Sequence, residues 1–253
     1  MLSWGQRRKF FFWGGLFVLF LGLFSAYGLS WYYRAPACAN GEEDGDERGV
    51  DCGGACARIC PADAFSPVIH FVRALEVEEG AWGAVAYGEN KNVGAGARRV
   101  PYIFKLYDEN QLLIYERRGA AFIPPRKVFA IFEGRMSTGS RFPSRATFEF
   151  LETPVFLRMT EPELAVDTRD FETSESGSSL QATITNPTRA TIEGIEVIAF
   201  LFGTDGNAFS ASATFVKALR PESSSLLTFT WPKTLPRPAR TEVLYTIPGR
   251  DEF

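Results

Sequence analysis

The sequence predicts an all-β fold: two β-sandwiches in tandem, after an N-terminal transmembrane helix and a small segment stapled by disulfides. Three observations lead to this prediction. The 253-residue chain has one long uncharged run near its N-terminus, all four cysteines lie within residues 38–60, and the rest reads as short alternating strands. Beyond the run, the chain is long enough for one large or two small domains.

Residues 10–33 carry no charge and are apolar on every helical face. At about 1.5 Å rise per residue, such a helix crosses a hydrocarbon core of about 30 Å. Tryptophan and tyrosine lie near both ends of the run, at positions 4, 13 and 31–33, where their amphipathic rings favour the membrane interface. The run therefore predicts a single transmembrane helix that ties the protein to a membrane.

The basic residues around this run predict its orientation. Three of them occupy positions 7–9, and only Arg34 follows before the first cysteine. Because positive charge favours the cytoplasmic side, residues 1–9 are expected to be a cytoplasmic tip, with residue 34 onward outside the cytoplasm. The alternative is a cleaved signal peptide with its site at residues 26–28. The apolar run continues past that site, which favours an uncleaved anchor in the cell membrane.

Residues 34–63 are expected to form an acidic, cysteine-rich spacer. Its four cysteines are an even number outside the cytoplasm, which predicts two disulfides. Three pairings are possible, and the segment is too small and polar to fold without covalent staples. A metal site on thiolates is the alternative, but the spacing differs from paired zinc ligands, and an oxidising compartment disfavours free thiols. The cysteines are Cys38, Cys52, Cys56 and Cys60.

The same segment gathers hard oxygen ligands among glycines, as calcium loops do. The regular Asp-x-Asp-Gly spacing of such loops is absent, so a solvated acidic turn is the alternative interpretation. The candidate calcium ligands are Glu43, Asp44, Asp46, Glu47 and Asp51.

The spacer also resembles a short motif of secreted and surface proteins, Asp-Gly…Asn-Gly-x-Glu-x-x-x-Asp-Cys-Gly-Gly-x-Cys. The resemblance covers about twenty residues and implies a stalk or spacer rather than an activity. The matching residues are Gly45, Glu47, Gly49, Asp51, Cys52, Gly53, Gly54 and Cys56.

From Phe65 onward the pattern has period two. Residues 100–107 alternate with a largely apolar face, which is typical of a half-buried strand. Similar runs recur between clusters of turn-forming residues, and Asp108-Glu109-Asn110 predicts the turn of a hairpin. The other runs are residues 68–77, 82–87, 112–115, 128–132 and 147–151.

Equal spacings predict that the second half repeats the first. Asn90 precedes Phe104 by 14 residues, as Asn186 precedes Phe200, and a proline follows each asparagine by 34 or 35 residues. The expected sandwiches span residues 64–158 and 163–249. We expect Phe104 to match Phe200, each buried in a core of its own. Phe132 is expected to match Phe229. The segment between them, the join, is short, which predicts that the sandwiches lie end to end.

The first half contains the sequence Phe-Lys-Leu-Tyr-Asp at residues 104–108. It resembles the bacterial extracytoplasmic domain family named for the FxLYD signature. The resemblance implies an immunoglobulin- or fibronectin-like sandwich, commonly on membrane-anchored proteins, with no general assigned activity. The second half departs from the signature, since residues 199–203 lack Tyr-Asp and the next acidic residue is Asp205.

No motif in the sequence predicts catalysis. His70 is the single histidine, and no nucleophile elbow or phosphate loop is present. The net charge of −3 disfavours nucleic acid as a partner. We therefore expect no cofactor other than the candidate calcium. The expected function is a structural or interaction protein that presents two sandwiches to protein partners in the cell envelope. The alternative is a binding module for a cell-envelope polymer or a small ligand.

Overall fold

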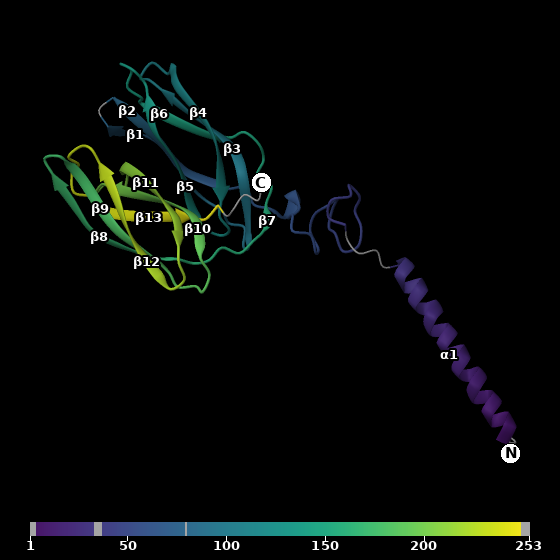
Figure 1. Cartoon of the computed structure of the whole chain (residues 1–253). Helices are drawn as coiled ribbons and strands as arrows, with labels where there is room; N and C mark the ends of the chain where they lie inside the picture. Colours follow the sequence, from purple (N-terminus) through teal and green to yellow (C-terminus); the bar gives the residue numbers. More distant parts are fainter. Residues whose placement is uncertain (1–3, 33–36, 79, 249–253) are drawn as a thin grey trace. The chain divides into compact units, whose positions relative to one another are not determined.

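The structure is a computed structural model that describes residues 4–32, 37–78 and 80–248 (Figure 1). The predicted helix end at Tyr33, the basic Arg34 and the predicted last residue of the second sandwich, 249, lie outside the described residues. The chain forms two compact units, Met1–Cys60 and Pro61–Phe253, and each is described by itself.

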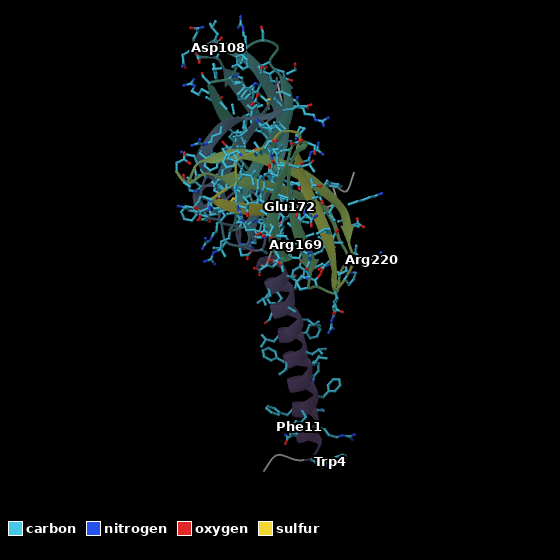
Figure 2. The ribbon with its side chains drawn as sticks, turned by 90° about the vertical axis from the view of Figure 1, so that its left-hand side faces the viewer. Trp4, Phe11, Asp108, Arg169, Glu172 and Arg220 are labelled. Carbon is cyan, nitrogen blue, oxygen red and sulfur yellow. A yellow bond between two sulfur atoms is a disulfide. The ribbon has the colours of Figure 1, made fainter. Side chains whose placement is uncertain are left out.

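The first unit contains helix α1 (Trp4–Tyr32) and the cysteine-rich segment. The helix begins six residues before the uncharged run, because the basic residues at 7–9 are themselves good helix formers. Its apolar side chains are exposed, as Trp4 and Phe11 show (Figure 2). Within the described chain it is the one helix that is long and apolar enough to cross a membrane.

The second unit is built of antiparallel strands and confirms the all-β prediction. After a short helical turn η1 (Pro61–Asp63), the described residues form thirteen strands. They are β1 (Val68–Glu78), β2 (Ala81–Glu89), β3 (Ala95–Tyr107), β4 (Leu113–Ile123), β5 (Val128–Ser137), β6 (Arg145–Phe150), β7 (Leu157–Arg158), β8 (Ala165–Ser174), β9 (Gly177–Asn186), β10 (Ile192–Phe202), β11 (Ala208–Leu219), β12 (Ser223–Trp231) and β13 (Arg240–Thr246).

These strands form four sheets with a repeated order. The first sandwich, β1–β7, has sheets β1-β2-β5 and β4-β3-β6, with β7 beside β3. The second sandwich, β8–β13, has sheets β8-β9-β12 and β11-β10-β13. When β1 to β6 are matched in order with β8 to β13, every pairing among β1–β6 recurs in the second sandwich, and only the β3–β7 pairing has no counterpart among the described strands. The order of pairing is thus the same in both halves.

The predicted hairpin turn lies between β3 and β4. Asp108 Oδ1 accepts hydrogen bonds from the backbone N–H groups of Asn110 at 2.9 Å and Leu112 at 3.0 Å. The turn between β10 and β11 has the same backbone pattern, with Gly203 in the place of Asp108. Its carboxylate comes from Asp205, which accepts from the N–H of Asn207 at 2.9 Å. The displaced aspartate of the second half therefore also stabilises its turn.

Each sandwich has a core between its own two sheets. In the second, Leu180 and Ile184 of β9 and Phe229 and Trp231 of β12 are at most 1% exposed and pack against β10. In the first, Phe104 of β3 and Phe129 of β5, one from each sheet, are both 0% exposed. The ring of Phe104 lies 5.0 Å from that of Phe148.

A further apolar cluster joins the two sandwiches, and it corrects the expected end-to-end arrangement. We call this cluster the shared core; it contains Leu75, Val85 and Ala130 from sheet β1-β2-β5, and Ile198, Phe200, Phe202, Ala208 and Ala211 from β10 and β11. The two sheets therefore pack face to face, and the second unit is a stack of four sheets (Figure 1). The short join does not impose an end-to-end layout because each sandwich also has an apolar outer face to bury.

The matched phenylalanines are both buried, but the match itself is wrong by one residue. Phe104 and Phe200 are each 0% exposed. Phe104 faces the core of its own sandwich, whereas Phe200 lies in the shared core, where its ring is 5.8 Å from that of Tyr87. The two hairpin turns align Asp108 with Gly203, so Phe104 corresponds to Ala199. One residue of offset moves a strand side chain to the opposite face.

The second expected pair differs in the same way. Asn90 N–H bonds to Lys127 O, and Asn186 pairs with Ser223, so these positions correspond. Phe132 lies five residues after Lys127, and Phe229 lies six residues after Ser223. Phe132 accordingly packs on the shared core, whereas Phe229 lies in the core of the second sandwich.

Candidate ligand site

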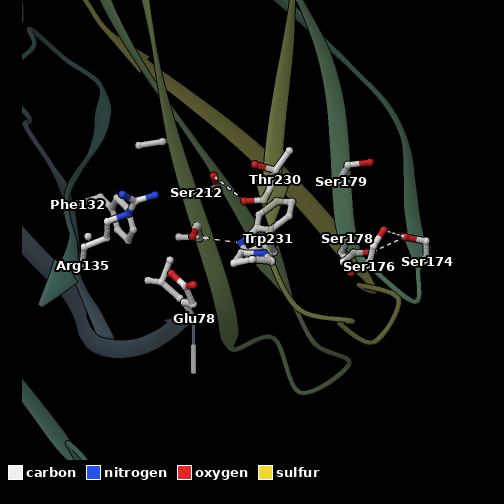
Figure 3. A pocket seen from close by; sticks show the side chains of 16 residues that line it. Glu78, Phe132, Arg135, Ser174, Ser176, Ser178, Ser179, Ser212, Thr230 and Trp231 are labelled. Carbon is white, nitrogen blue, oxygen red and sulfur yellow. Dashed lines mark hydrogen bonds between the residues drawn. The ribbon is translucent and has the colours of Figure 1, made fainter. Parts of the chain in front are cut away.

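A cavity of about 770 Å³ lies where the two sandwiches meet. We call it the junction cavity. The ends of β1 and β5 line one side, and the β8–β9 turn, β11 and the end of β12 line the other (Figure 3). Clefts of this size between two folded halves are a common place for ligands.

Arg135 stands on the β5 side of this cavity because the strand is irregular there. The pairing of β2 with β5 shifts between Trp82 and Ala84, opposite Met136 and Glu133. Arg135 has a φ of 53°, which is unusual for a residue with a side chain. Such bulges re-aim side chains and are over-represented near functional sites. The Arg135 guanidinium has no ion pair or hydrogen bond within the described residues.

Hydroxyl groups line the opposite side (Figure 3). Ser174 and Ser176 bond to each other at 3.0 Å, and the buried Ser178 Oγ accepts from Leu235 N–H at 2.8 Å. The hydroxyls of Ser179 and Thr230 make no hydrogen bond within the described chain. They remain available to a ligand.

Trp231 forms the buried floor between the two sides. It is 1% exposed, and its indole N–H donates to Ala211 O at 3.2 Å. Gly177 follows the β8–β9 turn with a φ of 143°, and a Cβ there would lie 2.5 Å from Trp231 O. The glycine therefore allows the turn to approach the floor of the cavity.

The lining of the junction cavity combines charged groups with hydroxyl groups. Arg135 and Glu78 supply a cation and an anion that have no ion pair within the part of the chain that the structure describes, and the facing hydroxyls can donate and accept hydrogen bonds. His70 lies outside the lining, with its side chain 44% exposed and Nε2 3.5 Å from Glu89 Oε2. The described lining thus holds no nucleophile beside a histidine base. The expected absence of catalysis stays a prediction.

The cysteine-rich segment has two disulfides, as expected. Cys38 bonds to Cys56 and Cys52 to Cys60, with Cα separations of 5.5 and 5.0 Å. These bonds correct the alternative of a thiolate metal site, because a disulfide sulfur carries no thiolate. Glu47 lies beside the sulfurs of the first disulfide, and for the same reason that group does not resemble a metal site.

Three of the five candidate calcium ligands are acceptors for the segment's own N–H groups. Asp51 accepts from Asn40 N–H at 2.8 Å and from Gly41 N–H at 3.0 Å. Asp44 accepts from the Asn40 side-chain amide at 2.7 Å, and the buried Glu47 accepts from Asp51 N–H at 3.1 Å. These bonds hold turns. Calcium binding stays a prediction.

The other two candidates, Glu43 and Asp46, make no side-chain hydrogen bond within the described residues. Steric crowding explains the two adjacent glycines of the motif, Gly53 and Gly54. Gly54 has a φ of 51°, and a Cβ there would lie 2.1 Å from Asp46 O. Gly53 has a φ of 77°, and its Cβ would lie 2.7 Å from Arg48 Cβ. Each position therefore requires glycine for both its backbone conformation and its space.

The sequence interpretation missed the junction cavity, since it lies between segments that are far apart in the chain. One signal pointed toward Arg135. Gly134 interrupts an otherwise alternating strand, and a glycine there often marks a bulge.

Comparison with known proteins identifies no relatives by sequence. No family model matches the chain, and no curated protein matches it. Among solved structures, red sea bream transglutaminase is similar over 70% of this chain and 28% of its own, with 12% identity and a TM-score of 0.23. A β-glucuronidase of glycoside hydrolase family 2 is similar over 81% and 25%, with 12% identity and a TM-score of 0.21. This chain thus spans under a third of either protein, and similarity at this level supports no argument about function.

Proposed function

We propose that this is a single-pass membrane protein that presents a rigid pair of β-sandwiches to protein partners in the cell envelope, without catalysis. Helix α1 supplies the anchor. The basic residues at 7–9 favour a cytoplasmic N-terminal tip, and two disulfides fit an oxidising compartment outside the cytoplasm. The resemblances to the FxLYD family and to the Asp-Cys-Gly-Gly-x-Cys motif are part of this proposal.

The observation that carries the proposal is the shared core. Linked domains usually move relative to one another unless a large apolar interface joins them. Here eight buried residues form such an interface. Polar contacts supplement it, since Tyr87 Oη donates to Glu242 at 2.8 Å and Lys233 lies 2.8 Å from Glu76. A rigid pair binds partners at a lower entropic cost than a flexible one.

Photo-crosslinking in native membranes tests this role. A photoreactive amino acid is placed in the full chain at Leu112 or Phe142, which are 53% and 68% exposed on the first sandwich, or at Leu226 on the second. We expect discrete adducts at a restricted set of positions. Those adducts should weaken in a Phe200→Ala chain, in which the shared core is loosened. Adducts from no position, or adducts unaffected by Phe200→Ala, would contradict the proposal.

Topology is tested separately. Protease added to spheroplasts should remove the strands and leave a membrane fragment with the N-terminal tip. Complete protection of the strands would refute the proposed orientation.

Arg135 favours a second candidate function, the binding of a cell-envelope polymer. A free guanidinium facing hydroxyls suits an acidic sugar, because arginine pairs with carboxylates through two parallel hydrogen bonds. We expect the full chain in detergent to bind trigalacturonate more tightly than neutral maltotriose. Arg135→Gln should weaken the binding of trigalacturonate, whereas Arg169→Gln, on exposed β8, should not. Equal binding of both sugars would exclude this candidate.

A further inference from the structure

A second cavity, of about 460 Å³, opens between the sandwiches beside β4 and β11. We call it the aromatic cavity, because Phe122, Phe132 and Phe215 line it. Two carboxylates also line it, Glu133 of β5 and Glu196 of β10. No lysine, arginine or histidine is among the described lining residues. An acidic site with aromatic walls favours a cation that has an apolar body.

One carboxylate is fixed in a hydrogen-bond network. Tyr102 Oη donates to Glu133 Oε1 at 2.6 Å, and Arg117 Nη1 lies 3.3 Å from Glu133 Oε2. Gly119 makes room for this pair, because a Cβ there would lie 2.4 Å from Tyr102 Oη and 3.1 Å from Glu133 Oε1. Arg117 offsets the charge of Glu133, and the second lone pair of Tyr102 Oη can still accept a hydrogen bond.

The other carboxylate has no such compensation. Glu196 pairs across the sheet with Phe215 and Thr246, on the side of β10 that faces the first sandwich. It makes no ion pair or hydrogen bond within the described residues. Glu196 is exposed on the strand surface, and the partial loss of water around its carboxyl raises its pKa. Tyr102 and Glu196 line the same cavity. Burial raises the pKa of the Tyr102 hydroxyl, and Glu133 and then Glu196 add to this shift.

We propose that the aromatic cavity binds a primary alkylammonium group, with Glu196 as its counter-ion. The ammonium donates hydrogen bonds to Glu196 and to Tyr102 Oη, while its alkyl chain lies against the phenylalanine rings. The volume lies within the range of small-ligand pockets. Two groups supply this chemistry: a free diamine, or a lysine side chain of a partner protein. The proposal concerns a site separate from the junction cavity and does not depend on the proposed function.

The test is calorimetric titration of the full chain in detergent with 1,5-diaminopentane, with a blocked Gly-Lys-Gly peptide, and with neutral 1-pentanol. We expect the two amines to bind and pentanol to bind at least about tenfold more weakly. Tighter binding of the peptide identifies a partner lysine as the source, and tighter binding of the diamine identifies a free amine.

Variants complete the test. Glu196→Gln should weaken the amines about tenfold or more, because it removes the counter-ion and keeps the shape. Glu172→Gln is the matched control, because Glu172 is exposed on β8 and is not among the residues that line this cavity. Tyr102→Phe should weaken the amines by a smaller factor. The proposal is overturned if Glu196→Gln binds amines as the parent chain does, if pentanol binds equally well, or if neither amine binds.

Discussion

Asn90 and Asn186 each use a buried side-chain amide to hold the chain that lies 34 residues later. Asn90 Nδ2 donates to Pro124 O at 2.7 Å, and Asn186 Nδ2 donates to Arg220 O at 3.0 Å. Both Oδ1 atoms accept from the N–H two residues on, at 3.0 and 2.9 Å. The two asparagines therefore fix the same corner in both sandwiches, and the sequence spacing reflects this shared role.

Replacing Asn186 by alanine should destabilise the second unit by about 2–3 kcal/mol, because buried carbonyl groups lose their donor. Asn186 donates to the carbonyls of Ala190 and Leu219 as well as Arg220. Asn186→Asp should cost more at neutral pH, since a carboxylate would face these three oxygens. Asn110→Ala is the control, because the exposed Asn110 uses only its backbone N–H. Urea unfolding followed by tryptophan fluorescence measures the difference, and equal midpoints for Asn186→Ala and Asn110→Ala would refute it.

Truncating Phe104 or Phe200 to alanine should cost about 3–5 kcal/mol each, since both side chains are fully buried. The two changes should differ in where they act. Phe104→Ala should raise hydrogen exchange mainly in β3 and its neighbours. Phe200→Ala should also raise it in β1, β2 and β5, because Phe200 belongs to the shared core. Hydrogen exchange read by mass spectrometry distinguishes these patterns, and an effect of Phe200→Ala confined to the second sandwich would contradict this role.

The sequence predicted the strands and turns well because those signals are local. Alternation and Asp108 in its turn act within a short stretch of chain, and the two asparagines recur at the same spacing in both halves. The faces of Phe200 and Phe132 were wrong because alternation shows that a strand has two faces and not which one is outside. Both faces of β10 are apolar, since Leu201 and Phe200 are each buried. The residues of one sandwich do not reveal that the other sandwich covers its outer face.

The candidate sites depended still more on tertiary contacts. The four cysteines predicted two disulfides but left three pairings open, since pairing is set by how the acidic turns fold. Glu196 and Tyr102 lie 94 residues apart in the chain and meet only because the sandwiches pack face to face. Gly119 and Gly134 are glycines inside strands, and they are the local signs of close approach that such sites leave.

Lys127 of the first sandwich and Glu161, in the segment between the two sandwiches, form an ion pair that we call the latch; the Glu161 side chain is buried and the Lys127 side chain is partly exposed. Lys127 Nζ lies 2.9 Å from Glu161 Oε2, in an ion pair with poor hydrogen-bond direction, and 3.2 Å from Tyr245 Oη. Glu161→Gln should destabilise the unit by about 2–4 kcal/mol, because it leaves the Lys127 charge without its partner. The double variant Lys127→Met with Glu161→Gln should recover part of this loss. Chemical unfolding measures all three chains, and additive losses would refute the coupling.

The same latch predicts no loss of stability near neutral pH. Burial acts to lower the pKa of Lys127, but the adjacent Glu161 carboxylate and the Tyr245 hydroxyl outweigh it and raise the pKa. A lysine whose folded pKa is raised contributes stability that is present below its unfolded pKa and is lost as pH rises through the folded value. Stability should therefore fall more steeply at strongly alkaline pH in the parent chain than in Lys127→Met. Parallel pH profiles would contradict this.

Glu196 predicts a second dependence of stability on pH, which arises from loss of water around a carboxyl group rather than from an ion pair. Desolvation raises its pKa in the folded state, so the folded chain holds this proton more tightly than the unfolded chain does. The parent chain should lose stability as pH rises from below the ordinary glutamate pKa through the raised one. Glu196→Gln should therefore be more stable than the parent at neutral pH and equal to it in acid. Thermal unfolding across pH measures this, with Glu172→Gln as the control. A Glu196→Gln chain that is less stable than the parent at neutral pH would show that the ionised Glu196 carboxylate does not destabilise the fold.

Gly54 predicts the folding of the cysteine-rich segment. Its φ of 51° disfavours any side chain, and a Cβ would lie 2.1 Å from Asp46 O, a contact that only a backbone shift relieves. That shift would move Cys52 and Cys56, each in a different disulfide. Gly54→Ala should therefore reduce correct pairing, which peptide mapping under non-reducing conditions would show as scrambled bonds or thiols that react with iodoacetamide.

Gly41→Ala is the matched control, because Gly41 also has a positive φ, 76°, but no atom lies within 4 Å of the added Cβ. It should keep both native disulfides at a cost of about 1 kcal/mol. Native pairing in Gly54→Ala, or equal scrambling in both variants, would show that space at Gly54 does not direct the pairing.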